Sequence, residues 1–102
     1  MSITIGNYSF DGPYSSTDRL KDKSGVYAIL CHKQQKYHLV DVGEAAKVRS
    51  RVENHDRKNC WQSNCKSTLC VAVYYTPHLQ QPGRRAIEQE IRNQYNPPCG
   101  ER

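Results

Sequence analysis

The sequence lacks any long apolar run, because its aliphatic and aromatic residues come in short clusters between polar stretches. A membrane-spanning helix needs about 20 mostly apolar residues, so none is expected. The first residues, Met1 to Thr4, show no basic segment followed by an apolar one, which is the pattern of a secretory signal. Internal repeats and low-complexity linkers are also absent. These absences predict a soluble, intracellular protein in the cytoplasm, with no membrane partner.

The cysteines show no Cys-x-x-Cys pair, and their number, five, is odd. Cys31 and Cys70 fall inside apolar runs, where a reduced cysteine packs as a small hydrophobic residue, so both are predicted to lie in the core. Cys60 and Cys65 have His32 and His55 near them in the sequence, which leaves a zinc site open as an alternative. Their spacing matches no structural zinc pattern, and buried or free thiols are the expectation.

The formal charge of +5 results from fifteen Lys and Arg residues against ten acidic residues. The basic residues become denser in one part of the chain, at Lys47, Arg49, Arg51, Arg57, Lys58 and Lys66. A basic cluster of this kind favours a polyanionic partner. An ordinary solvated helix face is the alternative interpretation.

A chain of 102 residues can form one small domain, which buries only about two-thirds of its unfolded surface. Residues 1–24 are expected to be an irregular lead-in packed on the domain, since Asp11-Gly12-Pro13 is a turn signal. The body of the domain, residues 25–102, begins with two apolar runs at 26–31 and 37–42. The short polar connection between them predicts an antiparallel hairpin.

From Glu44 the periodicity becomes helical. Apolar residues fall at helical spacing, and basic residues recur four apart on a neighbouring stripe, at Lys47, Arg51 and His55. Residues 56–68 are polar, with Trp61 as the one large anchor. The apolar run at 69–75 predicts a third strand in the centre of the sheet, and residues 84–95 predict a helix that ends before Pro97-Pro98. The expected fold is α/β (α+β-like), with a three-stranded, mainly antiparallel sheet flanked by helices.

Four features of this body stand at a characteristic spacing: Gly25-Val26-Tyr27, Asp41-Val42-Gly43, an arginine eight residues past Gly43, and Glu88 on the last helix. This layout resembles the GIY-YIG nuclease domain superfamily, as a small standalone member with a degenerate second tripeptide. The resemblance extends from Gly25 to the Pro-Pro stop. It implies a metal-dependent endonuclease of that fold.

The resemblance also implies roles for residues. Glu88 would ligate one Mg²⁺ or Mn²⁺ ion, Arg51 would clamp the phosphate, and Tyr27 would position or deprotonate the attacking water, which requires a lowered pKa. His55, one helical turn beyond Arg51, is a candidate for proton transfer or phosphate contact. Taken singly, each of these residues also fits a structural role, such as a half-buried strand tyrosine or a helix ion pair.

The second tripeptide departs from the family pattern, because Asp41 stands where the family has tyrosine. Asp41 is a candidate general base or second metal ligand beside Glu88, and it could equally repel a substrate phosphate. Glu44 adds a second carboxylate at the expected cleft. Gly100 stands where the family usually has asparagine, so weaker support of the last helix is expected.

The leading hypothesis is therefore an endonuclease that hydrolyses nucleic-acid phosphodiester bonds, with DNA as the expected substrate. The residues expected to contact nucleic acid are Lys47, Arg49, Arg51, Arg57 and Lys58. A weakly active or inactive nucleic-acid-binding module of the same fold is one alternative, and a protein-interaction or regulatory domain is another. The sequence shows no appended zinc finger or helix-turn-helix, so high sequence specificity is not expected.

Overall fold

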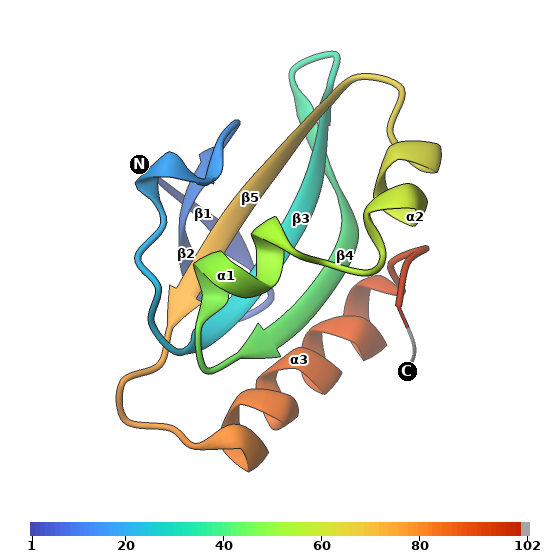
Figure 1. The fold of residues 1–102 in the computed structure, drawn as a ribbon. Coiled ribbons are helices and arrows are strands. Elements are labelled where there is room, and N and C mark those ends of the chain that lie inside the picture. Colours follow the sequence, from blue (N-terminus) through green and yellow to red (C-terminus); the bar gives the residue numbers. More distant parts are fainter. Residues whose placement is uncertain (101–102) are drawn as a thin grey trace.

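Residues 1–100 are described by a computed structural model, in which five antiparallel strands form one curled sheet (Figure 1). The strand order is β1-β2-β5-β3-β4. The strands are β1 (Ser2–Ile5), β2 (Tyr8–Tyr14), β3 (Gly25–Lys33), β4 (Lys36–Ala45) and β5 (Thr68–Tyr75). β5 is the middle strand, as its apolar run indicated.

The prediction of a three-stranded sheet is wrong. Two further strands, β1 and β2, lie within residues 1–24, which were expected to be irregular. β2 pairs with β5, and Phe10 on β2 is fully buried. The Gly12-Pro13 pair that suggested a turn instead lies inside β2, where the register with β5 shifts between Asp11 and Tyr14. Glycine and proline are tolerated in strands at such irregularities, so the turn signal was misleading.

The helices also differ from the prediction at their boundaries. β4 continues through Ala45, because Ala45 pairs with Gly25 of β3. The first helix, α1 (Val48–Glu53), is consequently short, and His55 follows it. A second short helix, α2 (Lys58–Ser63), lies in the polar segment 56–68, for which no helix was predicted. The last helix, α3 (Gln81–Tyr95), begins three residues before the predicted start, with Pro82 in its first turn, where proline is accommodated.

The sheet has a hydrophobic core on each face. On one face, Tyr27, Ile29 and Cys31 of β3 pack with residues of α1 and α2. On the other face, Val26, Ala28 and Leu30 of β3 pack with Ile87 and Ile91 of α3. Successive side chains of a strand point to opposite faces, so a strand covered on both sides reads as a continuous apolar run. Figure 1 shows α1 in front of the sheet, α2 at the right beside β4, and α3 running along the β4 edge. No helix within residues 1–100 is long and apolar enough to cross a membrane.

Four of the cysteines form disulfides, Cys31–Cys65 and Cys60–Cys99, which corrects the expectation of thiols. Cys70 keeps a buried thiol. The prediction that Cys31 and Cys70 lie in the core is confirmed. The sulfurs of Cys60 and Cys65 are bonded to other cysteines, so they are not available as zinc ligands. The two disulfides join the segment around α2 to β3 and to the residues that follow α3.

Candidate active site

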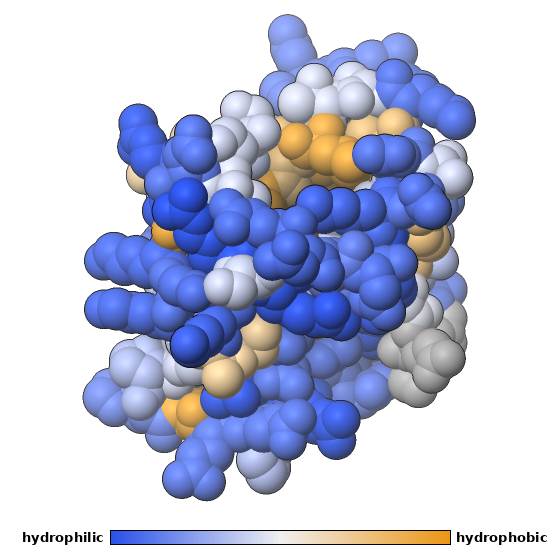
Figure 2. Space-filling view, in the orientation of Figure 1, coloured by the Kyte–Doolittle hydropathy of each residue, from blue (hydrophilic) through white to orange (hydrophobic). Residues whose placement is uncertain are grey.

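A polar cleft lies where the ends of β3 and β4 meet α1 and α3, with a volume of about 380 Å³. Its lining residues are Tyr27, Gly43, Glu44, Arg51, Arg57, Arg85, Glu88 and Gln89. Figure 2 shows hydrophilic side chains over α1 and α3 on this face, whereas an apolar hollow lies higher up, beside α2. The cleft brings together three of the predicted catalytic residues, Tyr27, Arg51 and Glu88, and one further predicted nucleic-acid contact, Arg57.

Tyr27 lies at the bottom of this cleft, because it faces Gly43 across the β3–β4 pair. A Cβ atom at position 43 would overlap the Tyr27 hydroxyl and the adjacent ring carbon. The ring can occupy this place only if residue 43 has no side chain. Position 43 therefore requires glycine for a steric reason, and this requirement does not depend on a turn or on an unusual φ angle.

The hydroxyl of Tyr27 is 2.6 Å from Nε2 of His55. The other ring nitrogen, Nδ1, accepts a hydrogen bond of 3.0 Å from the backbone N–H of Arg57. A backbone N–H can only donate, so Nδ1 carries no proton, although the exposed Asp56 carboxylate lies 3.3 Å from it. We therefore assign the proton to Nε2, which donates to the Tyr27 oxygen. The proton of Tyr27 itself is then free to point elsewhere.

The surroundings keep His55 neutral and Tyr27 protonated. Burial, together with the nearby Arg51 and Arg57, lowers the pKa of His55 to about 4. Burial raises the pKa of Tyr27 to about 12, although the same two arginines act in the opposite direction. A tyrosine that deprotonates water needs a lowered pKa, and the protein alone does not supply it. At neutral pH, Tyr27 is a hydrogen-bond donor.

Arg51 and Glu88 enter the cleft from different helices. Nη2 of Arg51 is 3.2 Å from the exposed carboxylate of Asp56, a contact weakened by solvent. Oε2 of Glu88 accepts a hydrogen bond from Nε of Arg92 at 3.1 Å. The other oxygen, Oε1, accepts no hydrogen bond from any residue among 1–100. One carboxylate oxygen is thus free to ligate. This fits Mg²⁺ or Mn²⁺, since Mg²⁺ is commonly held by one or two carboxylates plus water and substrate phosphates.

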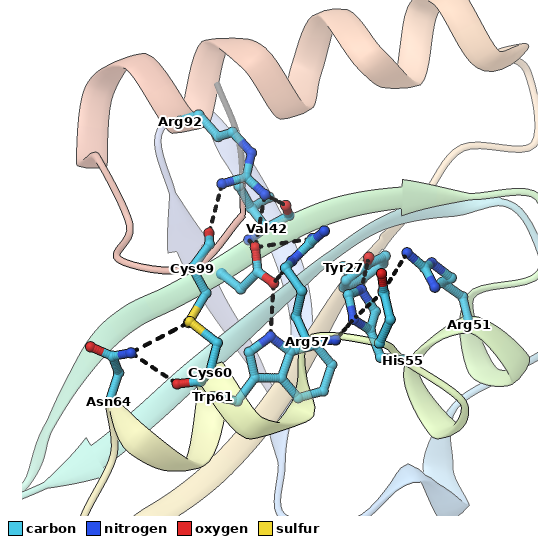
Figure 3. A network of polar contacts seen from close by, with 12 residues as sticks. Tyr27, Val42, Arg51, His55, Arg57, Cys60, Trp61, Asn64, Arg92 and Cys99 are labelled. Atoms are coloured by element: carbon cyan, nitrogen blue, oxygen red, sulfur yellow. Dashed lines mark hydrogen bonds and ion pairs between the residues drawn. A yellow bond between two sulfur atoms is a disulfide. The ribbon is translucent and has the colours of Figure 1, made fainter.

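Asp41 lies behind the cleft, which differs from its predicted position beside Glu88. Its side chain is fully buried, and its carboxylate accepts hydrogen bonds from Arg57, Trp61, Arg92 and the Val42 backbone (Figure 3). Between residues 29 and 30 of β3, the register with β4 shifts, as at a β-bulge. The two adjacent residues Val40 and Asp41 both contact the α1–α2 side. Sequence alternation alone does not reveal this irregularity.

The predicted nucleic-acid contacts divide into two groups. Arg51 and Arg57 line the cleft. Arg49 instead pairs with Glu53 and Asp18, and Lys58 donates to the backbone of Glu53. Lys47 is exposed at the beginning of α1. The five predicted nucleic-acid contacts therefore do not form one surface.

Three residues of α3 line the cleft, Arg85, Glu88 and Gln89. Arg85 and Gln89 were not predicted as site residues. Their spacing of three and four positions places them on one face of a helix, a signal that was present in the sequence. Arg84, on the same helix, is buried and bonds to Glu44 at 2.9 Å. This pairing neutralises the second carboxylate of the cleft.

Comparisons with protein-family models, with curated proteins and with solved structures found no match. The interpretation of the cleft therefore depends on its own residues.

Proposed function

We propose that this protein is a metal-dependent endonuclease of the GIY-YIG type, which hydrolyses phosphodiester bonds of nucleic acid, with DNA as the expected substrate. One observation supports this above all: Tyr27, Arg51 and Glu88, which lie far apart in the sequence, line the same polar cleft. His55 completes the group through its 2.6 Å contact with Tyr27. Hydrolysis of a phosphodiester needs a phosphate clamp, a positioned water and neutralisation of charge on the leaving oxygen. Arg51 would supply the clamp, Tyr27 would position the water, and Glu88 would hold the ion that neutralises the charge.

Each residue has a role that follows from its contacts. The Arg51 guanidinium binds the nonbridging oxygens of the phosphate, for which its planar fork is suited. Tyr27 accepts a hydrogen bond from His55 and donates its own proton into the cleft, where it orients the water or a phosphate oxygen. Glu88 would hold the divalent ion through Oε1. When bound, that ion activates water and neutralises charge on the leaving oxygen.

A nucleic-acid-binding module without cleavage is the second candidate, and two observations favour it. Tyr27 is protonated at neutral pH, with a pKa of about 12, so it is a poor base in the protein alone. Asp41, which replaces the second tyrosine of the family, is bonded to Arg57 and Arg92 and lies outside the cleft. On this interpretation the arginines of the cleft bind phosphate and no water is activated.

The two disulfides are relevant to the cellular compartment of the protein. Disulfides are typical of oxidising compartments and rare in cytosolic proteins. The Cys31–Cys65 and Cys60–Cys99 bonds therefore weigh against the cytoplasmic location predicted from the sequence. We include an oxidising compartment in the proposal.

The decisive experiment incubates the purified protein with labelled branched, single-stranded and duplex DNA, and with RNA, in Mg²⁺ or Mn²⁺. EDTA and Glu88→Gln are expected to abolish cleavage, whereas Glu88→Gln retains nucleic-acid binding. The matched control is Glu90→Gln, on the same helix but bonded to Tyr8 outside the cleft, and it should cleave as the wild type does. Binding without cleavage of any substrate would reject the nuclease and leave the binding module.

A further inference from the structure

The buried carboxylate of Asp41 connects four parts of the molecule. Oδ2 accepts from Nε of Arg57 at 2.9 Å and from Nε1 of Trp61 at 2.7 Å. Oδ1 accepts from Nη2 of Arg92 at 2.7 Å and from the Val42 backbone at 2.8 Å. These donors come from β4, α2, α3 and the connection between α1 and α2, and Figure 3 shows them converging on one point.

The two arginines of this network have different surroundings. The Arg92 side chain is only 2% exposed, and its guanidinium also donates to Glu88 and to the backbone carbonyls of Val42 and Cys99. A Cβ at Gly100 would overlap that guanidinium, so Arg92 is enclosed on every side. The Arg57 side chain is 29% exposed and lines the cleft. Arg57 is therefore the member of the network that can reach a ligand.

Asp41 binds one edge of the Arg57 guanidinium, through Nε and Nη2. No residue among 1–100 accepts a hydrogen bond from Nη1, so this nitrogen remains for a ligand in the cleft. An arginine held by a carboxylate on one edge presents its other nitrogens in a defined direction. We propose that Asp41 is a positioning residue, which holds Arg57 as a second phosphate-binding group beside Arg51. This inference deepens the proposed function and rests on it, because it names a substrate contact in the same cleft.

Positioning has to be distinguished from simple charge neutralisation. If Asp41 only cancels the charge of Arg57, removing the carboxylate charge should strengthen the binding of phosphate. If Asp41 positions Arg57, the same change leaves two like charges, Arg57 and the enclosed Arg92, next to each other. Arg57, on a surface connection, would then turn away into solvent, and phosphate binding would weaken. The two interpretations predict opposite signs for Asp41→Asn.

The test measures the affinity for fluorescein-labelled duplex DNA by anisotropy over a series of salt concentrations, in EDTA. Each lost phosphate contact should lower the slope of log affinity against log salt by about 1. We expect this reduction for Arg57→Gln and equally for Asp41→Asn, with no further reduction in the double variant, because both changes remove the same contact. The control is Lys33→Gln, which removes one positive charge at the tip of the β3–β4 hairpin, outside the cleft. Its slope should lie closer to that of the wild type than the slope of Arg57→Gln does.

The inference is overturned if Asp41→Asn binds more tightly than the wild type or keeps its slope, or if the wild type shows no salt-dependent binding. Because EDTA prevents metal-dependent cleavage, a failed nuclease would not alter these results. Should Asp41→Asn fail to fold, the salt slope of Arg57→Gln and the Nε–H resonance of Arg57 in the wild type decide together. A slope lowered by about 1 with an Nε–H protected from hydrogen exchange supports the proposal. An unchanged slope, or exchange as fast as that of the exposed Arg19, rejects it.

Discussion

Gly43 and Tyr27 face each other across β3 and β4, and the missing side chain at position 43 makes room for the tyrosine ring. The hydroxyl of that ring is in turn bonded to His55, whose other nitrogen is occupied by the backbone of Arg57. The protonation states of the site thus follow from a few fixed contacts. They predict how the protein responds to acid.

His55 should make the folded state sensitive to pH. The unfolded chain binds a proton on His55 near its ordinary pKa of 6.5, whereas the folded chain binds it only near 4. Between these values the unfolded state binds more protons, so the free energy of unfolding falls as the pH is lowered. At 1.36 kcal/mol for each pKa unit, the loss reaches at most about 3 kcal/mol. Urea denaturation at a series of pH values measures it.

The control is His55→Gln, which cannot take up the proton and should show a flatter profile in this range. The lowered pKa values of the carboxyl groups of Asp22, Glu53 and Asp56 contribute mainly at lower pH, since those groups titrate there. Equal losses in the wild type and in His55→Gln would contradict a buried, neutral histidine.

α2 is held in place by its contacts with the rest of the molecule. A helix of six residues has little stability of its own, and α2 is attached through Trp61 and through the cysteines beside it. Trp61 bonds to Asp41 and packs on His55, with ring centroids 4.5 Å apart. The position of α2 is therefore linked to the position of the cleft residues.

Removing one disulfide should release this element in part. The variant Cys60→Ser/Cys99→Ser opens a bond between residues 39 apart in the sequence, and we expect the free energy of unfolding to fall by about 2–4 kcal/mol. Denaturant titration gives this value. Cys70→Ala, which removes a thiol but no disulfide, is expected to lose about 1 kcal/mol. A direct check is the thiol count of the denatured wild type without reductant: one reactive thiol is expected, and five would show that the disulfides are absent.

At the scale of the whole molecule, the N-terminal hairpin belongs to the sheet. β2 pairs with β5, and the side chains of Ile5 and Phe10 are buried in the core on the α3 side. Hydrogen bonds also tie this hairpin to α3: Tyr8 donates to Glu90, and the Gly6 backbone donates to Tyr95. Residues 25–100 alone would expose the edge of β5 and part of one core.

We therefore expect a fragment of residues 25–102 not to fold cooperatively. Thermal denaturation followed by circular dichroism, together with the dispersion of amide resonances, measures this. In the full chain, Phe10→Ala should remain folded but lose about 3–5 kcal/mol, because it leaves a cavity in a closed core. A fragment with a sharp transition near that of the full chain would show that the hairpin is dispensable.

Several elements were predictable because their signals are local. The apolar runs of β3, β4 and β5 and the helical period of α3 are properties of neighbouring residues. β2 was missed because a Gly-Pro pair inside a strand resembles a turn, and β1, a short strand that pairs with β2, was missed with it. α2 was missed because six mostly polar residues carry little periodicity. Among the residues of the cleft, Tyr27, Arg51 and Glu88 were found through a characteristic spacing, whereas Arg85 and Gln89 were overlooked on the same helix face.

The sequence by itself determined the strands β3, β4 and β5 and the helix α3, and it indicated Tyr27, Arg51 and Glu88 as candidates for one site, since these signals depend on side-chain type and short-range spacing. Only the tertiary structure decided the pairing of β2 with β5, the pairing of four cysteines, and the burial of Asp41 against Arg57 and Arg92. Each of these is a contact between residues distant in the chain. Such contacts depend on the packing of the whole molecule, because a buried carboxylate or a strand edge is stable only when distant parts of the chain supply its hydrogen-bonding partners.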